Sequence, residues 1–392
     1  MTLNGKQITV VGGGIGGLAA AVAMAQRGGR VTVLEQAEAI TEVGAGLQIG
    51  PNGYTVLRAL GLGDALAAKS VRATGVRLLD GVSGQQVFAL DFQRFRPDQH
   101  YYMVHRADLI DVLAEAARAA GVEIRLSQRL ESVAFDQNQA QLQMADGQVL
   151  MPELFICAGG LHSKLRPVIN GKREPFFTKQ VAWRMVIPAL GGEAPMAQVF
   201  MGHGKHLVTY PLRGGELINV VAVQERDIWA AEGWNYKTDP AELSYVFGDF
   251  CDEVQALFER VEDVYLWGLF RHPVAARWHQ GNAALLGDAA HPTLPFMAQG
   301  AVMALEDAWV LADALDQDTP VEQALASYQN RRRQRAAAVV EAANQNARNY
   351  HFGPGPKRSL AHLALRMGSR LAPGLALKKY DWIYGYDVTK ES

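Results

Sequence analysis

A glycine-rich turn near the N-terminus holds the first residues whose types and spacing could do chemistry. Gly12, Gly14 and Gly17 form the pattern G-x-G-x-x-G directly after a β-branched apolar run at Gln7–Val11. An alanine-rich run with helical character follows at Ile15–Arg27. The free backbone N–H groups at the start of such a helix bind phosphate groups, so the pattern points to a phosphate-containing ligand.

Each glycine of this turn has a mechanical task. Gly12 allows the tight turn, Gly14 lets a pyrophosphate approach the backbone, and Gly17 lets the helix and strand pack closely. Glu35 ends the next predicted strand, Val31–Glu35, where its carboxylate can accept hydrogen bonds from a ribose hydroxyl. The βαβ context therefore predicts a site for an adenosine diphosphate moiety, against the alternative of a glycine turn without a ligand. The motif alone does not distinguish FAD from NAD.

His206 and Tyr210 form a second candidate pair, in the pattern H-x-x-x-Y-P. Residues four apart in a strand point to the same face, because side chains alternate with a period of two. A histidine can take a proton from a hydroxyl group, and a tyrosine can hydrogen-bond to the oxyanion that results. On spacing alone, a packed pair on a half-buried strand explains the two residues equally well.

The rest of the chain has the composition of an ordinary globular protein. It has 392 residues, 49% of them hydrophobic, and a formal net charge of −2, which favours neither a nucleic-acid nor a membrane partner. Cys157 and Cys251 are too few for a disulfide framework and lie in no metal-binding pattern, so we expect no metal and a reducing, cytoplasmic location. Glycines interrupt the apolar run Ile8–Ala25, which argues against a signal sequence or a membrane span.

The elements that must position these residues change in character along the chain. A helix at Ala107–Ala120 and a strand at Val122–Leu126 repeat the nucleotide-binding pattern, which returns at a strand Ala283–Leu286 and a helix Ala301–Leu315. Between these parts, alternating runs separated by Gly and Pro turns predict an antiparallel sheet. Its predicted strands are Val181–Ile187, Gln198–Met201, Leu207–Tyr210 and Leu217–Val223.

The C-terminal third of the chain is predicted to be helical. It contains a run of arginines, at positions 331, 332, 333 and 335. We interpret this run as a solvated face rather than a nucleic-acid site, because the chain as a whole is not basic.

A segment after the predicted sheet favours FAD over NAD. Asp288, in the sequence Leu285–Pro292, follows a strand, where its carboxylate can hold the ribityl hydroxyls of a flavin. A helix that begins near Gly300 would direct its positive end at the flavin pyrimidine edge, where negative charge accumulates on reduction. At this point the chain resembles the single-component FAD-dependent aromatic hydroxylases, in the branch of salicylate, 3-hydroxybenzoate and 6-hydroxynicotinate hydroxylases.

The resemblance covers nearly the whole chain. The residues that carry it are the glycine turn, Glu35–Gln36, Gly44–Asn52, His105–Leu109, Gly287–Pro292 and Trp382–Asp387. It implies FAD as cofactor, NADH or NADPH as co-substrate, O2, and hydroxylation of a small aromatic acid or phenol through a flavin C4a-hydroperoxide.

The same resemblance implies which residues bind the cofactor. Arg106 reaches the phosphate and ribityl region, Asp288 the ribityl chain, and Gly300, Ala301 and Val302 the pyrimidine edge. The other residues of the implied FAD site are Gly12, Gly14, Ile15, Gly17, Glu35, Gln36, Gly46 and Leu130. For Arg106, a surface salt bridge is the alternative.

On the substrate side, the H-x-x-x-Y-P pattern matches the corresponding strand of the 3-hydroxybenzoate branch. The resemblance therefore favours His206 as the base and Tyr210 as a hydrogen-bond donor that stabilises a phenolate. Gln48 corresponds to a position that lines the substrate cavity, although a loop hydrogen bond explains it equally well. Arg184 could meet a substrate carboxylate, but a structural ion pair is the favoured interpretation. For His291, a structural hydrogen-bonding role explains the residue at least as well as a catalytic one.

The chain departs from the family pattern in two segments. Gly159 stands where relatives usually carry an aspartate before glycine, which puts FAD retention or the efficiency of NAD(P)H use in doubt. Thr293–Phe296 lacks the glutamine of the 3-hydroxybenzoate branch, and Pro295 fits the salicylate pattern better.

The expected fold is α/β: a Rossmann-type FAD-binding domain interrupted by a mostly antiparallel substrate domain, with a helical C-terminal tail. We expect the FAD-binding domain at 1–180, with a small substrate-domain insertion near 70–105, and again at 276–345. The antiparallel domain spans 181–275 and the tail 346–392. As partners we expect a small aromatic substrate and O2, with no nucleic acid, no stable membrane association, and a monomer or homodimer. The alternative functions are a flavin dehydrogenase or oxidase without oxygen insertion, and a flavin-binding protein without turnover.

Overall fold

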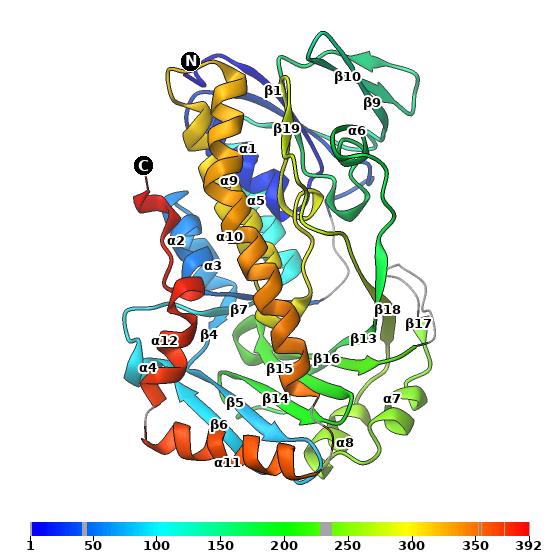
Figure 1. Ribbon diagram of the computed structural model, residues 1–392, viewed down its shortest axis with the longest axis vertical. Coiled ribbons are helices and arrows are strands. Elements are labelled where there is room, and N and C mark those ends of the chain that lie inside the picture. The colour runs from blue at the N-terminus through cyan, green and yellow to red at the C-terminus, as the bar shows by residue number, and fades with distance from the viewer. Residues whose placement is uncertain are drawn as a thin grey trace.

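Two sheets toward opposite ends of the molecule and a long helix that runs between them define the fold (Figure 1). The computed structural model describes residues 2–40, 45–227, 237–351, 353, 355–371 and 373–391. Gly44, one of the residues that carry the family resemblance, lies outside this described part. Within it, no helix is long and apolar enough to cross a membrane.

The N-terminal βαβ unit forms where the glycine turn predicts it. Strands β1 (Gln7–Val11) and β2 (Arg30–Leu34) pair in parallel, and helix α1 (Ile15–Ala25) connects them. The helix ends before Arg27, because Gly28 adopts a φ of +88° and turns the chain toward β2. The glycine turn thus joins the carboxyl end of a strand to the N-terminus of a helix.

The nucleotide-binding sheet has six strands in the order β19-β20-β12-β1-β2-β8. The strands not yet given are β8 (Glu123–Arg125), β12 (Leu154–Cys157), β19 (His279–Gln280) and β20 (Ala283–Leu285). Neighbours are parallel except β19 and β20. Since β12 and β20 pair although most of the second large sheet lies between them in sequence, the chain leaves the Rossmann-type sheet and returns to it, as predicted.

The second large sheet has eight strands in the order β17-β18-β13-β16-β15-β14-β5-β6. Its strands are β5 (Gly75–Asp80), β6 (Gln86–Asp91), β13 (Phe176–Pro188), β14 (Met196–Gly202), β15 (Lys205–Leu212), β16 (Leu217–Glu225), β17 (Lys237–Thr238) and β18 (Val264–Arg271). Every pair is antiparallel except β14 with β5. The expectation of a mostly antiparallel domain is confirmed.

Two small sheets complete the strand inventory of the described residues. One consists of β3 (Gly46–Ile49), β7 (Tyr102–His105) and β4 (Ser70–Arg72), in the order β3-β7-β4. The other consists of β9 (Leu130–Asp136), β10 (Gln139–Met144) and β11 (Val149–Leu150). The first of these sheets carries Gly46 and Gln48.

Helices cover the large sheets and form the C-terminal part. Their bounds are α2 (Pro51–Ala59), α3 (Gly63–Ala68), α4 (Phe92–Phe95), α5 (Arg106–Ala119), α6 (Arg166–Asn170), α7 (Ala241–Val246), α8 (Asp252–Phe258), α9 (Gly300–Leu315), α10 (Val321–Tyr350), α11 (Pro356–Leu371) and α12 (Pro373–Tyr384). Helix α1 packs against α5 and α9, and α10 extends from the six-stranded sheet toward the eight-stranded sheet (Figure 1). The predicted helical tail is confirmed.

The two faces of the eight-stranded sheet have different roles. Apolar side chains of α7 and α8 pack against one face, where they bury Trp183 and Leu207. Because side chains alternate along a strand, the neighbouring Arg184 and His206 point to the opposite face, and Tyr210 lies on that face as well. This second face forms a wall of the cavity described below. The segment near 70–105 supplies β5 and β6 to the same sheet, while the bounds of the four predicted parts stay a prediction.

The arginine run in α10 corrects the expectation of a solvated face. Arg332 is 0% exposed, and its guanidinium lies 2.7 Å from a Glu306 carboxylate oxygen and 2.8 Å from an Asp307 oxygen. Arg335 also pairs with Glu306, at 2.9 Å, whereas Arg333 is exposed. Charge count alone could not show that α9 carries two buried carboxylates opposite these arginines. Arg332 and Arg335 therefore hold α10 against α9 through ion pairs.

Candidate active site

One cavity of about 1140 Å³ connects the six-stranded sheet with the free face of the eight-stranded sheet. Gly14, Ala158 and Leu286, which follow the carboxyl ends of β1, β12 and β20, line one part of it. His206 and Tyr210 line the other part. Open α/β sheets bind ligands outside the carboxyl ends of their strands, so this is the expected place for a nucleotide cofactor. The volume exceeds that of ordinary small-molecule pockets and leaves room for a large cofactor beside a substrate.

The glycine turn provides an open cradle on the cavity wall. Gly14 precedes α1 as its N-cap residue, and apart from its neighbours in the chain no protein atom lies within 4 Å of the position that a Cβ would occupy there. By contrast, a Cβ on Gly12, whose φ is +113°, would lie 2.4 Å from the Ala158 carbonyl oxygen. A Cβ on Gly17 would clash with the Gly12 carbonyl oxygen. Gly12 and Gly17 therefore permit the tight local packing, and Gly14 leaves space for a ligand.

Glu35 closes this cradle from the end of β2. One of its carboxylate oxygens accepts a hydrogen bond of 2.6 Å from Gly13 N, and the other accepts one of 2.9 Å from Ala37 N. These bonds hold the carboxylate beside the turn. The neighbouring Gln36 lines the cavity, as does Ile15 at the start of α1.

Asp288 and Arg106 line the cavity from two different elements. The carboxylate of Asp288 is open to the cavity yet surrounded by protein, and this burial raises its pKa, against the opposing effects of His291 and Arg106. Arg106 begins α5 and also lines the cavity. A carboxylate and a guanidinium in these places can bind ribityl hydroxyls and a phosphate, respectively.

The N-terminus of α9 also faces the cavity. Gly300 and Ala301 line it, and Gln299 at the N-cap uses its side-chain oxygen to accept a 2.9 Å hydrogen bond from Asn52 instead of capping the helix. The first N–H groups of α9 are thus available to an electron-rich edge. Val302 points away from the cavity toward α2, where its methyl groups lie 2.9 Å and 3.1 Å from the position that a Cβ on Gly53 would occupy. Any contact that Val302 makes with a cofactor is through its backbone.

The residues on this half of the cavity fit FAD. The fit rests on the open Gly14 cradle, the Asp288 carboxylate and two helix N-termini without side-chain caps. Leu130 is buried in the core at the start of β9 and is not among the residues that line the cavity.

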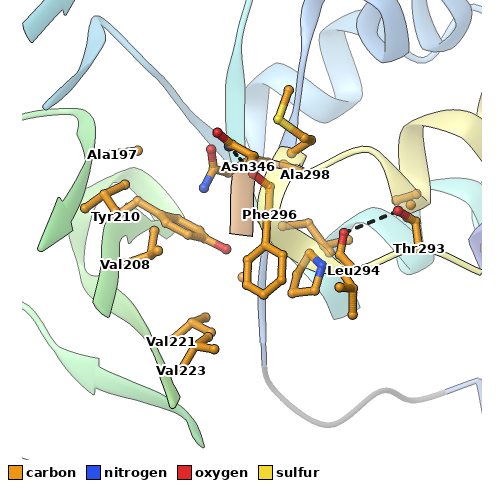
Figure 2. A pocket seen from close by; sticks show the side chains of 18 of the residues that line it. Ala197, Val208, Tyr210, Val221, Val223, Thr293, Leu294, Phe296, Ala298 and Asn346 are labelled. Carbon is orange, nitrogen blue, oxygen red and sulfur yellow. Dashed lines mark hydrogen bonds between the residues drawn. The ribbon is translucent and has the colours of Figure 1, made fainter. Parts of the chain in front are cut away.

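Tyr210 lies at the other end of the cavity with two polar neighbours. Figure 2 shows it extending from the sheet toward Phe296, with Val208, Val221 and Val223 nearby. Burial raises the pKa of the Tyr210 phenol, while the nearby Arg184, Gln48 and Asn219 act in the opposite direction. The phenol therefore stays protonated and can donate a hydrogen bond.

Gly46 explains how β3 comes so close to Tyr210. A Cβ on Gly46 would lie 2.6 Å from the Tyr210 ring, so a larger residue does not fit there. The Gly46 N–H donates a 2.6 Å hydrogen bond to Oδ1 of Asn219 on β16. Gln48, two residues further along β3, accepts a 3.0 Å hydrogen bond from the Tyr101 hydroxyl. Tyr101 lines the cavity and was not predicted from the sequence, since nothing local links it to Gln48.

His206 lies in an apolar and aromatic environment on the same face of β15. It is 1% exposed, and its ring centroid lies 5.4 Å from that of Phe296 and 5.2 Å from that of Tyr350. Burial, and secondarily the nearby His351, lower the pKa of His206 well below its usual value. His206 is therefore neutral at pH 7 and has a nitrogen lone pair for a proton.

The structure shows the surroundings of Arg184 and His291, two residues whose roles the sequence left open. Arg184 lines the cavity, and its guanidinium lies 3.9 Å from the ring centroid of Trp267. His291 is 0% exposed, and its Nε2 lies 2.5 Å from Asp307 in the cluster around Arg332. The geometry favours the structural interpretation of His291.

Comparisons with known proteins agree with this geometry. The model of the FAD binding domain family matches residues 6–343. This chain belongs to that family. A 3-amino-4-hydroxybenzoate 2-monooxygenase of Streptomyces platensis is 32% identical, with 98% of this chain and 97% of the relative covered.

Two other relatives of this FAD-binding family member are also named as a hydroxylase or monooxygenase of an aromatic acid. A 3-hydroxybenzoate 6-hydroxylase of Aquipseudomonas alcaligenes is 31% identical over 98% of this chain and 99% of the relative. A 6-hydroxynicotinate 3-monooxygenase of Bordetella bronchiseptica is 33% identical over 99% of this chain and 97% of the relative. The expected resemblance to FAD-dependent aromatic hydroxylases is confirmed.

Solved structures show the same fold. HpxO of Klebsiella pneumoniae, in complex with FAD and uric acid, aligns with a TM-score of 0.83 and 25% identity over 94% of this chain and 95% of that one. A salicylate hydroxylase substrate complex aligns with a TM-score of 0.80 and 23% identity over 98% of this chain and 97% of that one. The expectation of FAD as cofactor, with NAD(P)H as co-substrate, is confirmed for this FAD-binding family member.

Proposed function

We propose that the protein hydroxylates a small aromatic acid that carries a ring hydroxyl, with His206 as the general base and Tyr210 as a hydrogen-bond donor to the substrate. The observation that carries this proposal is the single cavity, which joins a half that fits FAD to a half that contains both residues. The substrates named for the relatives are hydroxybenzoates, an aminohydroxybenzoate and a hydroxynicotinate. All of them carry a ring oxygen that a base can activate.

The chemistry requires an electron-rich ring. Bound FAD, reduced by NAD(P)H and supplied with O2, provides an electrophilic oxygen atom. Removal of the proton from the ring hydroxyl raises the electron density at the ring carbons, and His206 is neutral and therefore able to accept that proton. Tyr210 stays protonated and donates a hydrogen bond to a substrate oxygen.

The spacing of the two residues limits how they act. Four residues of extended strand separate the two Cα atoms by roughly 13 Å. A single benzoate ring is shorter than this distance, so the side chains must converge on one oxygen or bind opposite ends of the substrate. Arg184 lines the same cavity and acts electrostatically on Tyr210, which supports a carboxylate at the Tyr210 end and the reacting hydroxyl at the His206 end.

The test is a comparison of His206→Ala with wild type in the presence of 3-hydroxybenzoate, salicylate, 6-hydroxynicotinate and 3-amino-4-hydroxybenzoate. We expect product formation with the active compound to fall about 100-fold, because a positioned general base contributes that much or more. Flavin reduction should persist, and hydrogen peroxide per NAD(P)H should rise. His279→Ala, on the far edge strand β19, is the matched control.

Unchanged coupling in His206→Ala would show that the base lies elsewhere. If the substrate instead stimulates reduction of an electron acceptor, and the product contains no added oxygen atom, the protein is a dehydrogenase or oxidase. A cytoplasmic location and a monomeric or homodimeric state stay predictions for this protein.

A further inference from the structure

A chain of hydrogen bonds links His206 to the molecular surface. Nδ1 of His206 lies 2.6 Å from Nε2 of His351, and Nδ1 of His351 lies 2.7 Å from a carboxylate oxygen of Glu225. The side chain of His351 is 3% exposed, whereas that of Glu225 is 53% exposed. The path therefore begins at a buried cavity residue and ends at a carboxylate in contact with solvent.

Three separate parts of the chain build this path. His206 lies near the start of β15, and Glu225 is the last residue of the neighbouring β16. The Glu225 N–H donates a 2.7 Å hydrogen bond to Gly204 O, which fixes the end of β16 beside the turn before β15. His351 follows α10, and Gly204 N donates a 3.4 Å hydrogen bond to its carbonyl oxygen.

The order of the atoms determines the tautomers. An ionised Glu225 can only accept, so Nδ1 of His351 carries the hydrogen and Nε2 of neutral His351 has the lone pair. That lone pair accepts from Nδ1 of His206, so Nε2 of neutral His206 is left without a hydrogen. In the described part of the chain no protein group bonds to this nitrogen, and His206 lines the cavity. The chain thus sets up a proton acceptor at the cavity.

We propose that His351 and Glu225 form a proton relay that carries the substrate's hydroxyl proton from His206 to solvent. This inference rests on the proposed function. The ring hydroxyl gives its proton to Nε2 of His206, as Nδ1 of His206 gives its own proton to Nε2 of His351. Nδ1 of His351 then passes a proton to Glu225, and Glu225 releases it to water. One proton leaves the substrate and one reaches solvent, no electrons are transferred, and the reverse sequence restores the hydroxyl in the product.

The surroundings favour transfer over storage of the proton. Burial lowers the pKa of both histidines, so neither holds a charge readily, while Glu225 partly offsets this effect at His351. The other titratable groups around the pair are His203, which also lowers the pKa of His351, and Tyr350, which faces His206. The two histidines therefore do not retain a proton that reaches His206, and the hydrogen-bonded chain gives that proton a path to the surface.

Two variants separate proton transfer from simple positioning. In Glu225→Gln and His351→Gln, the amide oxygen can still accept the hydrogen bond but cannot carry a proton onward. We expect each variant to slow product formation about tenfold, a part of the usual contribution of acid–base catalysis, with anaerobic flavin reduction unchanged. Glu216→Gln, which removes an exposed carboxylate at the other end of β16, is the matched control. Wild-type product formation in both relay variants would overturn the relay.

A second measurement needs no substrate. Nitrogen NMR of the FAD-loaded protein labelled with 15N-histidine should show His351 protonated at Nδ1 and His206 protonated at Nδ1, and Glu225→Gln should change the His351 signals. A hydrogen on Nε2 of His351 would overturn the relay. If wild type hydroxylates none of the four aromatic compounds above, the proposed function is wrong, and the tautomers then decide whether the chain of hydrogen bonds exists as described.

Discussion

His206 and His351 are 145 residues apart in the sequence, yet their ring nitrogens lie 2.6 Å apart. The contact joins the eight-stranded sheet to the segment that follows α10. The C-terminal part of the chain thereby supplies the partner that orients the proposed base. No periodicity or motif could have predicted this pair, because it depends on how α10 crosses the molecule.

The Gly14 position tests the cofactor site. Gly14→Leu should reduce FAD affinity at least about tenfold, since the added side chain enters space that is open in the protein and would be filled by the pyrophosphate. Gly368→Leu, on an exposed position of α11 that also has an open Cβ site, is the control. The measurement is FAD per chain after gel filtration, with thermal unfolding of the apoprotein as a check on folding. Equal FAD content in both variants would exclude Gly14 from the site.

The Gly159 position tests the departure from the family pattern. A Cβ at Gly159 would be in ordinary contact with Ser163 at 3.7 Å and Cys157 at 3.8 Å, and the φ of −75° is open to any residue, so the backbone accepts an aspartate there. Gly159→Asp should tighten FAD binding or speed reduction by NAD(P)H about tenfold, the factor that corresponds to ~1.4 kcal/mol. Gly159→Asn tests whether the charge is needed. If Gly159→Asp changes neither quantity, the missing carboxylate is already compensated.

Replacing Arg332 tests whether this arginine of α10 is a buried partner of the carboxylates on α9 rather than part of a solvated face. Arg332→Met should lower the free energy of unfolding by about 3–5 kcal/mol, because Glu306 and Asp307 lose a buried partner. Arg333→Met, on the exposed side of the same helix, should have little effect. Chemical unfolding of the apoproteins measures both. Similar stability of the two variants would show that Arg332 contributes no more than a surface arginine.

The buried cluster of Asp307, His291 and Arg332 predicts how the stability of the protein depends on pH. Burial alone would raise the pKa of Asp307, but His291 and Arg332 outweigh it and hold this pKa at about 2. The folded pKa is lower than the unfolded value of about 3.9, so the contribution to stability is present above about pH 4 and lost as pH falls toward 2. In Arg332→Met the loss should begin at higher pH. An unchanged acid-unfolding midpoint would contradict the assigned charge state.

Much of the architecture could be predicted from sequence, but the chemistry of the site could be predicted only in part. The glycine turn and its flanking strands have a local signature, and the alternation along β15 correctly placed His206 and Tyr210 on one face. The pairing of Gln48 with Tyr101, and of Arg332 with Glu306, depends on distant segments. Polar side chains reveal their partners only when the packing is known, which is why the arginine run was misinterpreted.

Tyr210→Phe tests the second proposed substrate contact. It should raise hydrogen peroxide per NAD(P)H less than His206→Ala does, with a loss of product formation of about fivefold for one hydrogen bond. Because burial raises the pKa of Tyr210, the residue stays protonated through the alkaline range, so the alkaline pH dependence should match that of wild type. Tyr245→Phe, at a 90% exposed position, is the control. Wild-type coupling in Tyr210→Phe would reduce Tyr210 to a packing role.

The origin of the oxygen atom in the product tests the central claim most directly. The purified protein is incubated under 18O2 with NADH or NADPH and each of 3-hydroxybenzoate, salicylate, 6-hydroxynicotinate and 3-amino-4-hydroxybenzoate, and the products are analysed by mass spectrometry. We expect at least one compound to stimulate NAD(P)H oxidation and to gain a hydroxyl group that contains one 18O atom. NAD(P)H oxidation that yields no 18O-labelled product with any of these compounds would contradict the assignment as an aromatic hydroxylase of this substrate class.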